Sequence, residues 1–346
     1  MDRNEKWTWL LILQGFAILA VLANHAHLGF ATIEMPTNLQ GVHPLDAAGM
    51  WIAWYVVEFT SMIAMPIFFM ISGYLFFLTR IDKNWDYVPM LKEKIYRLGI
   101  PYLFVILLGI VVKLFYTSGR AIDISAAGFI RNFTHPAEGA MREMWFIVSL
   151  LLYFLMFPIY RLTLKSIPIS LFILLLGCGL YYLPMANITS FLAINYALHF
   201  FVFFYGGMVI ASRRWDKRFT SLQGMILMTI LFIIGEICKI TLLERGAISC
   251  ILWGLAVATD RYLTRNIFRS FRDYTYQIYL IGICGEICVK LLYRQFSFPG
   301  SYILWWGLCI IAGIYLPVAV SRRLERSNTK IAGFLRRCLG LGNPAK

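Results

Sequence analysis

Apolar residues are gathered along this chain into long runs that short polar segments separate. A run of about 20 apolar residues is long enough to cross the hydrocarbon core of a bilayer as a helix. The pattern predicts ten spans, at about residues 8–28, 51–79, 99–117, 143–160, 168–184, 195–211, 222–241, 247–260, 274–293 and 301–320. We therefore expect an all-α, polytopic membrane protein, with one integral-membrane domain over residues 1–346 and a basic tail at 321–346.

The first run carries two polar side chains, Gln14 and His25, in apolar surroundings. They are just over three helical turns apart, which places them on one helix face at a separation of about 16 Å along the axis. If the N-terminus is inside, Gln14 lies in the inner half of the membrane and His25 lies near its outer edge. An ionisable group in a membrane helix is costly, so His25 is a candidate functional residue. The alternative is an interfacial His that hydrogen-bonds a neighbouring helix.

The same run could instead be a signal peptide. Arg3 and Lys6 precede it, and Val-Leu-Ala at 21–23 resembles a cleavage site. Cleavage there would remove His25, so sequencing the N-terminus of the mature protein distinguishes the two interpretations.

Composition agrees with the membrane interpretation, since 60% of the residues are hydrophobic and 14% are charged. The net charge of +14 would suggest nucleic acid as a partner of a soluble protein, but its distribution argues against that. Of the 32 Lys and Arg residues, five lie in predicted outer loops, namely Arg120, Arg131, Arg142, Arg245 and Arg294. Three lie within spans, namely Lys113, Lys239 and Lys290. The rest lie on the side that also holds both termini, which predicts cytoplasmic termini and a basic inner face open to anionic headgroups or an anionic cofactor.

Other polar residues in the spans favour structural roles. Glu236 with Lys239, and Glu286 with Lys290, have the spacing of ion pairs on one helix face. His199 also favours a structural role. The seven Cys residues form no C-x-x-C pair, and no cluster of His, Cys, Asp and Glu completes a ligand set, so we expect neither a disulfide framework nor a metal.

Six motifs follow one another in a characteristic order. They are a polar residue and a His with ten residues between them (Gln14, His25), F-F-x-x-S-G-Y-L from residue 68, basic-x-x-R-L-x-x-P-Y from 94, W-F-x-x-x-L-x-x-Y from 145, F-x-F-F-Y-G-G from 201 and Y-x-Y-x-I-Y-L from 274. The ordered set resembles the acyltransferase-3 family, which comprises bacterial multi-pass membrane enzymes that O-acylate surface glycans. The resemblance covers residues 14–281.

The resemblance implies roles for a few residues. It places the family's catalytic His on His25, and it places the donor-binding pair on Lys94 and Arg97. The family's Arg falls on Gln14, which is a departure that puts donor binding or helix positioning in doubt. A second His of many members falls on Gly282. The resemblance also implies an acyl-CoA donor, most simply acetyl-CoA, a glycan acceptor that can be lipid-linked, and a place in the bacterial cytoplasmic membrane.

The chemistry of acyl transfer fits these residue types. Attack of a sugar hydroxyl on a thioester needs a base, and imidazole suits that role near neutral pH. Lys94 and Arg97 would meet the phosphates of the donor, with Arg213 and Arg214 as further candidates. Gln14 would line the path of the thiol arm as a hydrogen-bonding amide. A relay through an acyl-His intermediate remains open, and Lys94 and Arg97 could also be ordinary inner-face charges.

Two acidic residues are weaker candidates for substrate binding. Glu58 could orient the imidazole of His25 or pair with Lys113, and Glu143 could contact the acceptor. Two other functions also remain open. A carrier or flippase for a lipid-linked sugar or small anion would use the charges within the spans as its path. A non-catalytic relative would explain Gln14 and Gly282.

Overall fold

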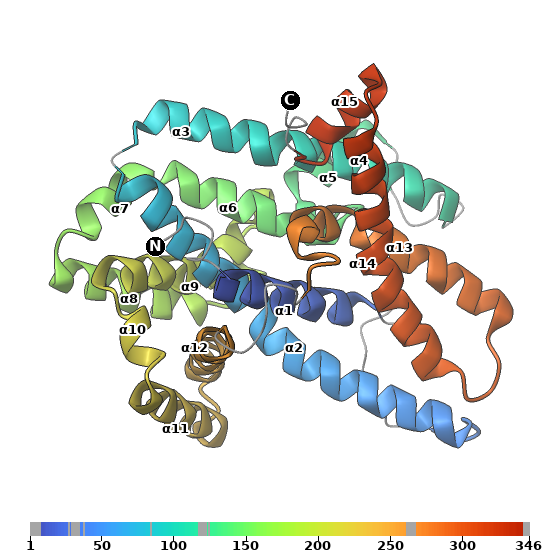
Figure 1. Ribbon diagram of the computed structural model, residues 1–346, viewed down its shortest axis with the longest axis horizontal. Helices are drawn as coiled ribbons and strands as arrows, with labels where there is room; N and C mark the ends of the chain where they lie inside the picture. Colours follow the sequence, from blue (N-terminus) through green and yellow to red (C-terminus); the bar gives the residue numbers. More distant parts are fainter. Residues whose placement is uncertain are drawn as a thin grey trace. The chain divides into compact units, whose positions relative to one another are not determined.

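The computed structural model describes residues 8–26, 28, 35–36, 39–83, 85–116, 123, 125–260 and 268–341. Those residues form helices and no strand, which confirms the predicted all-α fold (Figure 1). Arg3, Lys6, Arg120 and the last five residues of the predicted basic tail lie outside the described part of the chain.

Seven helical segments are long and apolar enough to cross a membrane. They are Thr8–His25 (α1); Pro44–Ile81, made of α2 (Pro44–Phe76) and η1 (Phe77–Ile81); Tyr87–Leu114, in α3 (Tyr87–Lys94), η2 (Ile95–Gly99) and α4 (Ile100–Tyr116); Phe191–Arg213, made of η6 (Phe191–Ala193) and α9 (Ile194–Arg213); α12 (Thr241–Thr259); Arg272–Phe296, made of η7 (Arg272–Tyr274) and α13 (Thr275–Phe296); and α14 (Tyr302–Arg326). The chain is a multi-pass membrane protein.

The other three predicted spans also contain apolar helices. The fourth is a pair bent by 59°, which joins η4 (Arg142–Met144) and α6 (Trp145–Leu155) to α7 (Phe157–Thr163) and would make an eighth span. The fifth and seventh are the shorter helices α8 (Ile167–Tyr181) and α11 (Leu222–Cys238). The remaining helices are α5 (Ala126–Thr134), η3 (Pro136–Glu138), η5 (Met185–Asn187), α10 (Asp216–Phe219) and α15 (Lys330–Cys338).

The described chain divides into two compact units. The first comprises residues 1–68 and 248–333 with the C-terminal 344–346, and the second comprises residues 69–247 and 334–343. The division falls inside α2, two residues after Pro66. His25 and Gln14 belong to the first unit, whereas Lys94 and Arg97 belong to the second.

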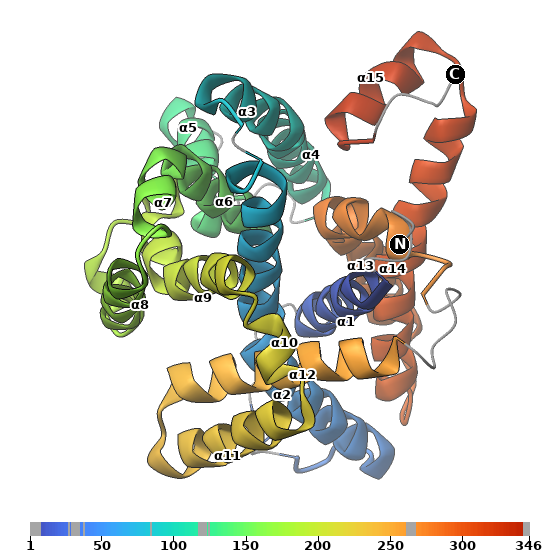
Figure 2. The ribbon, with the colours of Figure 1, turned by 60° about the vertical axis from the view of Figure 1, so that its left-hand side comes forward.

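In the first unit, α1 packs against α13 and α14, as both ribbon views show (Figures 1 and 2). The contact depends on small residues, because a Cβ atom at Gly282 would lie 3.0 Å from Leu22 Cδ2 and 2.9 Å from the carbonyl oxygen of Gly313. Such close approach of helix backbones is the usual way in which membrane helices associate. A side chain at position 282 would therefore meet both α1 and α14, so the packing of these helices favours glycine there.

In the second unit, the later part of α2 crosses α9 with their backbones in contact. A Cβ atom at Gly73 would collide with the carbonyl of Phe204, and one at Gly207 would collide with the carbonyl of Met70. Both glycines belong to motifs that carry the family resemblance. Aromatic side chains fill the core beside this crossing, where Phe69 stacks on Phe200 at 5.2 Å between ring centroids. Those two motifs therefore serve helix packing.

Candidate functional site

His25 is the last residue of α1, and its backbone carbonyl is held by a lysine of another helix. The carbonyls at the end of a helix lack partners within the helix. Lys290 Nζ of α13 donates a hydrogen bond to the carbonyl oxygen of His25 at 2.6 Å. Lys290 also pairs with Glu286 one turn earlier at 3.6 Å, and both side chains are buried. The predicted i,i+4 pair is thus confirmed, and it also fixes the end of the helix that carries the candidate catalytic residue.

Apolar and aromatic side chains surround this end of α1. Ala23, Ala26 and Leu28 join one buried cluster with side chains of α2 and α14. From α14, Tyr302, Trp306 and Cys309 complete the cluster, and the side chains of Tyr293 and Trp305 pack against it. The His25 side chain itself is half-buried. Its intermediate exposure shows that protein does not enclose the His25 side chain completely.

Gln14 lies on the same helix, also half-buried. Ile18 and Leu22, between Gln14 and His25 on the predicted stripe, are buried at 0% and 3% exposure. The stripe therefore faces protein. Glu58 of α2, in contrast, is an exposed side chain.

Asp46, in the first turn of α2, links this helix to the segment between α13 and α14. Its two carboxylate oxygens accept hydrogen bonds from the backbone N–H groups of Gly300 and Tyr302, each at 2.8 Å. These bonds tie the start of α2 to the loop that connects α13 and α14, next to the aromatic side chain of Tyr302. Sequence reasoning did not single out Asp46, since an acidic residue in the first turn of a helix is common.

The second unit carries the candidate donor-binding residues. Lys94 ends α3, and its ammonium lies 4.9 Å from the centroid of the Phe154 ring. Arg97 lies in the π-helical segment η2 and is exposed. Both are therefore placed within one turn of each other, with Arg97 accessible to an anion.

Arg80 is a basic residue of this site that sequence reasoning missed. It lies in the other π-helical segment, η1, and pairs with Glu93 at 2.7 Å, while its guanidinium lies 3.9 Å from the Trp85 ring centroid. Arg80 and Arg97 both lie within electrostatic reach of Lys94. π-Helical turns are rare and occur often at functional sites. The only sequence signal was the positive charge itself, because nothing in the hydrophobic pattern distinguishes π from α turns.

Two further candidates have structural contacts. Arg213 Nη2 donates to the carbonyl of Leu164 at 2.9 Å, which links the end of α9 to the end of α7. Arg214 caps α9 in a left-handed conformation with φ of 53° and is exposed. Glu143 is half-buried in η4 and lies within electrostatic reach of Lys113 of α4.

Three remaining predictions concern an ion pair at the end of α11, the role of His199 and a metal site. Lys239 lies 3.8 Å from Glu236, which confirms that pair. His199 stacks on Tyr181 with ring centroids 4.2 Å apart. Among the described residues, no group of three or more His, Cys, Asp or Glu side chains could hold a metal ion.

The comparisons with known proteins give one match. No curated protein and no solved structure matches this chain. A family model described as an acyltransferase domain, that of the acyltransferase-3 family, matches residues 7–322, which include every motif noted above and both α1 and α13. The chain therefore belongs to the acyltransferase-3 family, a family of membrane acyltransferases.

Proposed function

We propose that this protein transfers an acyl group, most simply acetyl, from acyl-CoA to a hydroxyl of a surface or lipid-linked glycan. The single observation that carries the proposal is the family match over residues 7–322, which includes a helix that ends at His25. Its setting in a bacterial cytoplasmic membrane, with cytoplasmic termini, is part of the same proposal. The basic inner segments support that orientation.

His25 acts as the general base in this proposal. The acceptor hydroxyl oxygen attacks the thioester carbonyl, its proton passes to the imidazole, and the CoA thiolate leaves with the pair of electrons of the broken C–S bond. The hydrogen bond from Lys290 to the His25 carbonyl supports this assignment, because it restrains the helix end that carries the imidazole. Positioning of a catalytic group accounts for a large part of enzymatic rate enhancement.

Arg80, Lys94 and Arg97 bind the phosphates of the donor. Guanidinium and ammonium groups are the usual partners of phosphate. Arg80 of η1 and Arg97 of η2 both lie within electrostatic reach of Lys94, and Glu93, which pairs with Arg80, offsets only part of this positive charge. Gln14 contributes an amide hydrogen bond to the donor.

The test uses purified full-length protein with acetyl-CoA labelled in its acetyl group. The variant is His25→Ala, and the control is His43→Ala, which removes an exposed imidazole of the same unit. We expect wild type and His43→Ala to release CoA thiol, and His25→Ala to be slower by about 10²- to 10⁴-fold.

Each other outcome has a meaning. An acetyl group found on His25 by peptide mass spectrometry would replace the general base by an acyl relay. Equal rates for His25→Ala and wild type would overturn the role of His25. Folded wild-type protein that never consumes the thioester would overturn the enzyme and favour a carrier or a non-catalytic family member.

A further inference from the structure

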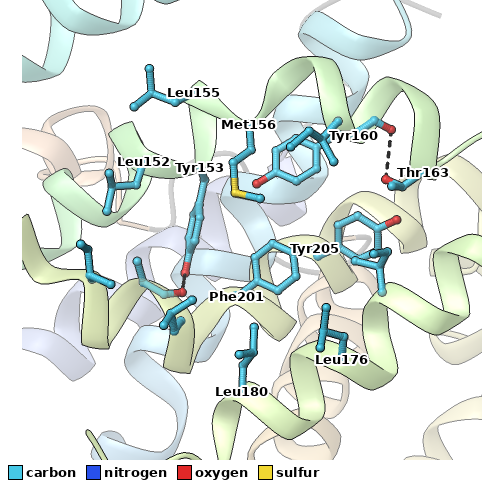
Figure 3. Close-up of a pocket in the computed structure, with 15 residues that line it drawn as sticks. Leu152, Tyr153, Leu155, Met156, Tyr160, Thr163, Leu176, Leu180, Phe201 and Tyr205 are labelled. Atoms are coloured by element: carbon cyan, nitrogen blue, oxygen red, sulfur yellow. Dashed lines mark hydrogen bonds between the residues drawn. The ribbon is translucent and has the colours of Figure 1, made fainter. Parts of the chain in front are cut away.

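A long apolar groove lies between α6–α7 and the hairpin of α8 and α9, within the second unit (Figure 3). Its volume is about 420 Å³. The groove follows α9 from Ile194 to Tyr205, a length of about 16 Å at 1.5 Å per residue. Nearly all of its lining is hydrocarbon or aromatic surface, so its occupant must be apolar over most of its length.

The groove is open along one side. Leu155, Ile159 and Leu176 line it and are also about half-exposed, at 47%, 49% and 50%. These residues belong to apolar helices of predicted spans, so in a bilayer that those helices cross the opening would face the hydrocarbon region. An acyl chain of a lipid can enter sideways from there without passing through water.

Charge is confined to one end of the hairpin. No Asp, Glu, Lys or Arg occurs from Ser166 to Ser212, and basic residues flank this stretch at Lys165 and Arg213. The hydrogen bond from Arg213 to the carbonyl of Leu164 brings both flanks to the same end of the hairpin. Thr163, next to that end, lines the groove. A molecule with an apolar chain and an anionic head would therefore fit this groove in one orientation.

A buried hydroxyl adds a polar contact to the wall. The Tyr160 side chain is 1% exposed, and its hydroxyl has no hydrogen-bond partner among the described residues. Figure 3 shows that hydroxyl directed toward Met156 and Tyr153. A buried donor without an acceptor destabilises the folded protein, and an incoming carbonyl oxygen would offset that cost.

We propose that this groove binds an acyl chain of an anionic membrane phospholipid. The chain lies along α9, an ester carbonyl accepts the hydrogen bond of Tyr160, and the headgroup phosphate is held by Lys165 and Arg213. The lipid in this groove is a structural ligand of the protein in the membrane. Its binding is independent of the acyl transfer assigned to His25.

The experiment uses full-length protein in phosphatidylcholine vesicles that contain a trace of phosphatidylglycerol with a photoreactive diazirine in its acyl chain. After illumination, mass spectrometry maps the labelled peptides. We expect label on the segments 152–163, 173–180 and 194–205, and we expect excess unlabelled phosphatidylglycerol to remove it more effectively than excess phosphatidylcholine.

Matched variants separate the groove from the general lipid contact surface. Leu176→Trp fills the groove, whereas Leu175→Trp enlarges a neighbouring exposed side chain that does not line it. We expect the first to lower labelling by about tenfold, equivalent to about 1.4 kcal/mol, and the second to leave it unchanged. Tyr160→Phe removes the hydroxyl and is expected to lower labelling by less than Leu176→Trp does. Lys165→Gln should reduce the preference for phosphatidylglycerol, with Lys217→Gln as the control for an exposed basic residue.

The proposal fails if Leu176→Trp and Leu175→Trp label alike, because the lipid contact is then not specific to the groove. Equal competition by the two lipids would overturn the anionic headgroup. Crosslinks between two copies of the chain through α8 would assign the groove to a dimer contact instead. Size-exclusion chromatography establishes that each variant is folded, and Leu176→Phe replaces Leu176→Trp if the latter aggregates.

Discussion

Lys290 Nζ donates a hydrogen bond of 2.6 Å to the backbone carbonyl of His25, from one membrane helix to the end of another. The ammonium that caps α1 is itself paired with the buried carboxylate of Glu286. Residues that are 265 positions apart in the sequence thus determine where the candidate catalytic imidazole is held. A side chain of different length or charge at position 290 would therefore displace the end of α1.

Replacing Lys290 alone should be more harmful than replacing the pair. Lys290→Met leaves the Glu286 carboxylate buried without its cation, which costs about 3–5 kcal/mol. In Glu286→Gln/Lys290→Met both charges are gone, so we expect much of the thermal stability to return. Thermal unfolding followed by size-exclusion chromatography measures this. If the double variant is as unstable as the single one, the capping bond rather than the buried charge dominates.

A substitution at Lys290 can also distinguish a role in positioning His25 from a role in the stability of the protein. Lys290→Arg keeps a cation beside Glu286, so we expect folded protein. Its side chain differs from lysine in length and would displace the end of α1, so we expect a reduced kcat and an unchanged KM for acetyl-CoA. A purely structural Lys290 would lower the amount of folded protein and leave kcat per folded molecule unchanged. Steady-state kinetics on the monodisperse fraction distinguishes the two.

Gln14→Ala should weaken donor binding. Loss of one hydrogen bond costs about 1 kcal/mol, which corresponds to about a fivefold rise in Kd for acetyl-CoA. Leu19→Ala, on a different face of α1, serves as the control for loss of side-chain volume. Calorimetric titration gives both affinities, and equal values for Gln14→Ala and wild type would remove Gln14 from the site.

Arg80→Gln and Arg97→Gln should each reduce affinity for acetyl-CoA by about tenfold, since a hydrogen bond to a charged group contributes about 1.5–3 kcal/mol. The effect should diminish at high salt, because screening weakens exposed charge interactions. Lys92→Gln, an exposed neighbour on α3, should bind the donor as wild type does. If all three variants lose affinity equally, the donor responds to the general charge of this face rather than to the π-helical arginines.

Gly73→Ala and Gly207→Ala should destabilise the second unit. Each added methyl group would meet a backbone carbonyl of the crossing helix, which cannot move as a side chain can, and overpacking of this kind costs about 1–3 kcal/mol. Gly179→Ala in α8 is the control, since its Cβ would meet nothing within 4 Å. A helical Gly→Ala change there is expected to be neutral or stabilising. Thermal unfolding of the three variants tests the difference.

The segment before α6, residues 126–144, should become less stable as the pH falls. Hydrogen bonds from Ser190 and from Arg131, the latter at 2.6 Å, hold the pKa of Glu138 below its usual value of 4.5. Because the folded state favours the ionised carboxylate, this contribution is present above about pH 4.5 and is lost as the pH falls through the lowered pKa. In Glu138→Gln, hydrogen exchange of the segment 126–144 should therefore change less between pH 6 and pH 4 than in wild type. An equal change in both would assign the acid sensitivity to another group.

The sequence by itself determined the helical membrane architecture and the family. Each of the ten predicted runs contains an apolar helix. The length and hydropathy of a run are local properties, and they decide whether the run can cross a bilayer as a helix. Gln14 and His25 were found on one helix for the same reason, and their roles stay predictions.

Only the tertiary structure decided what surrounds those residues. The capping of His25 by Lys290, the crossing of α2 and α9 at Gly73 and Gly207, and the π-helical setting of Arg80 join segments far apart in the chain. Such contacts depend on the close packing of complementary surfaces, and no single segment encodes the surface that it meets. The sequence therefore identified the imidazole, while the packing of α1 against α13 fixed the helix end that carries it.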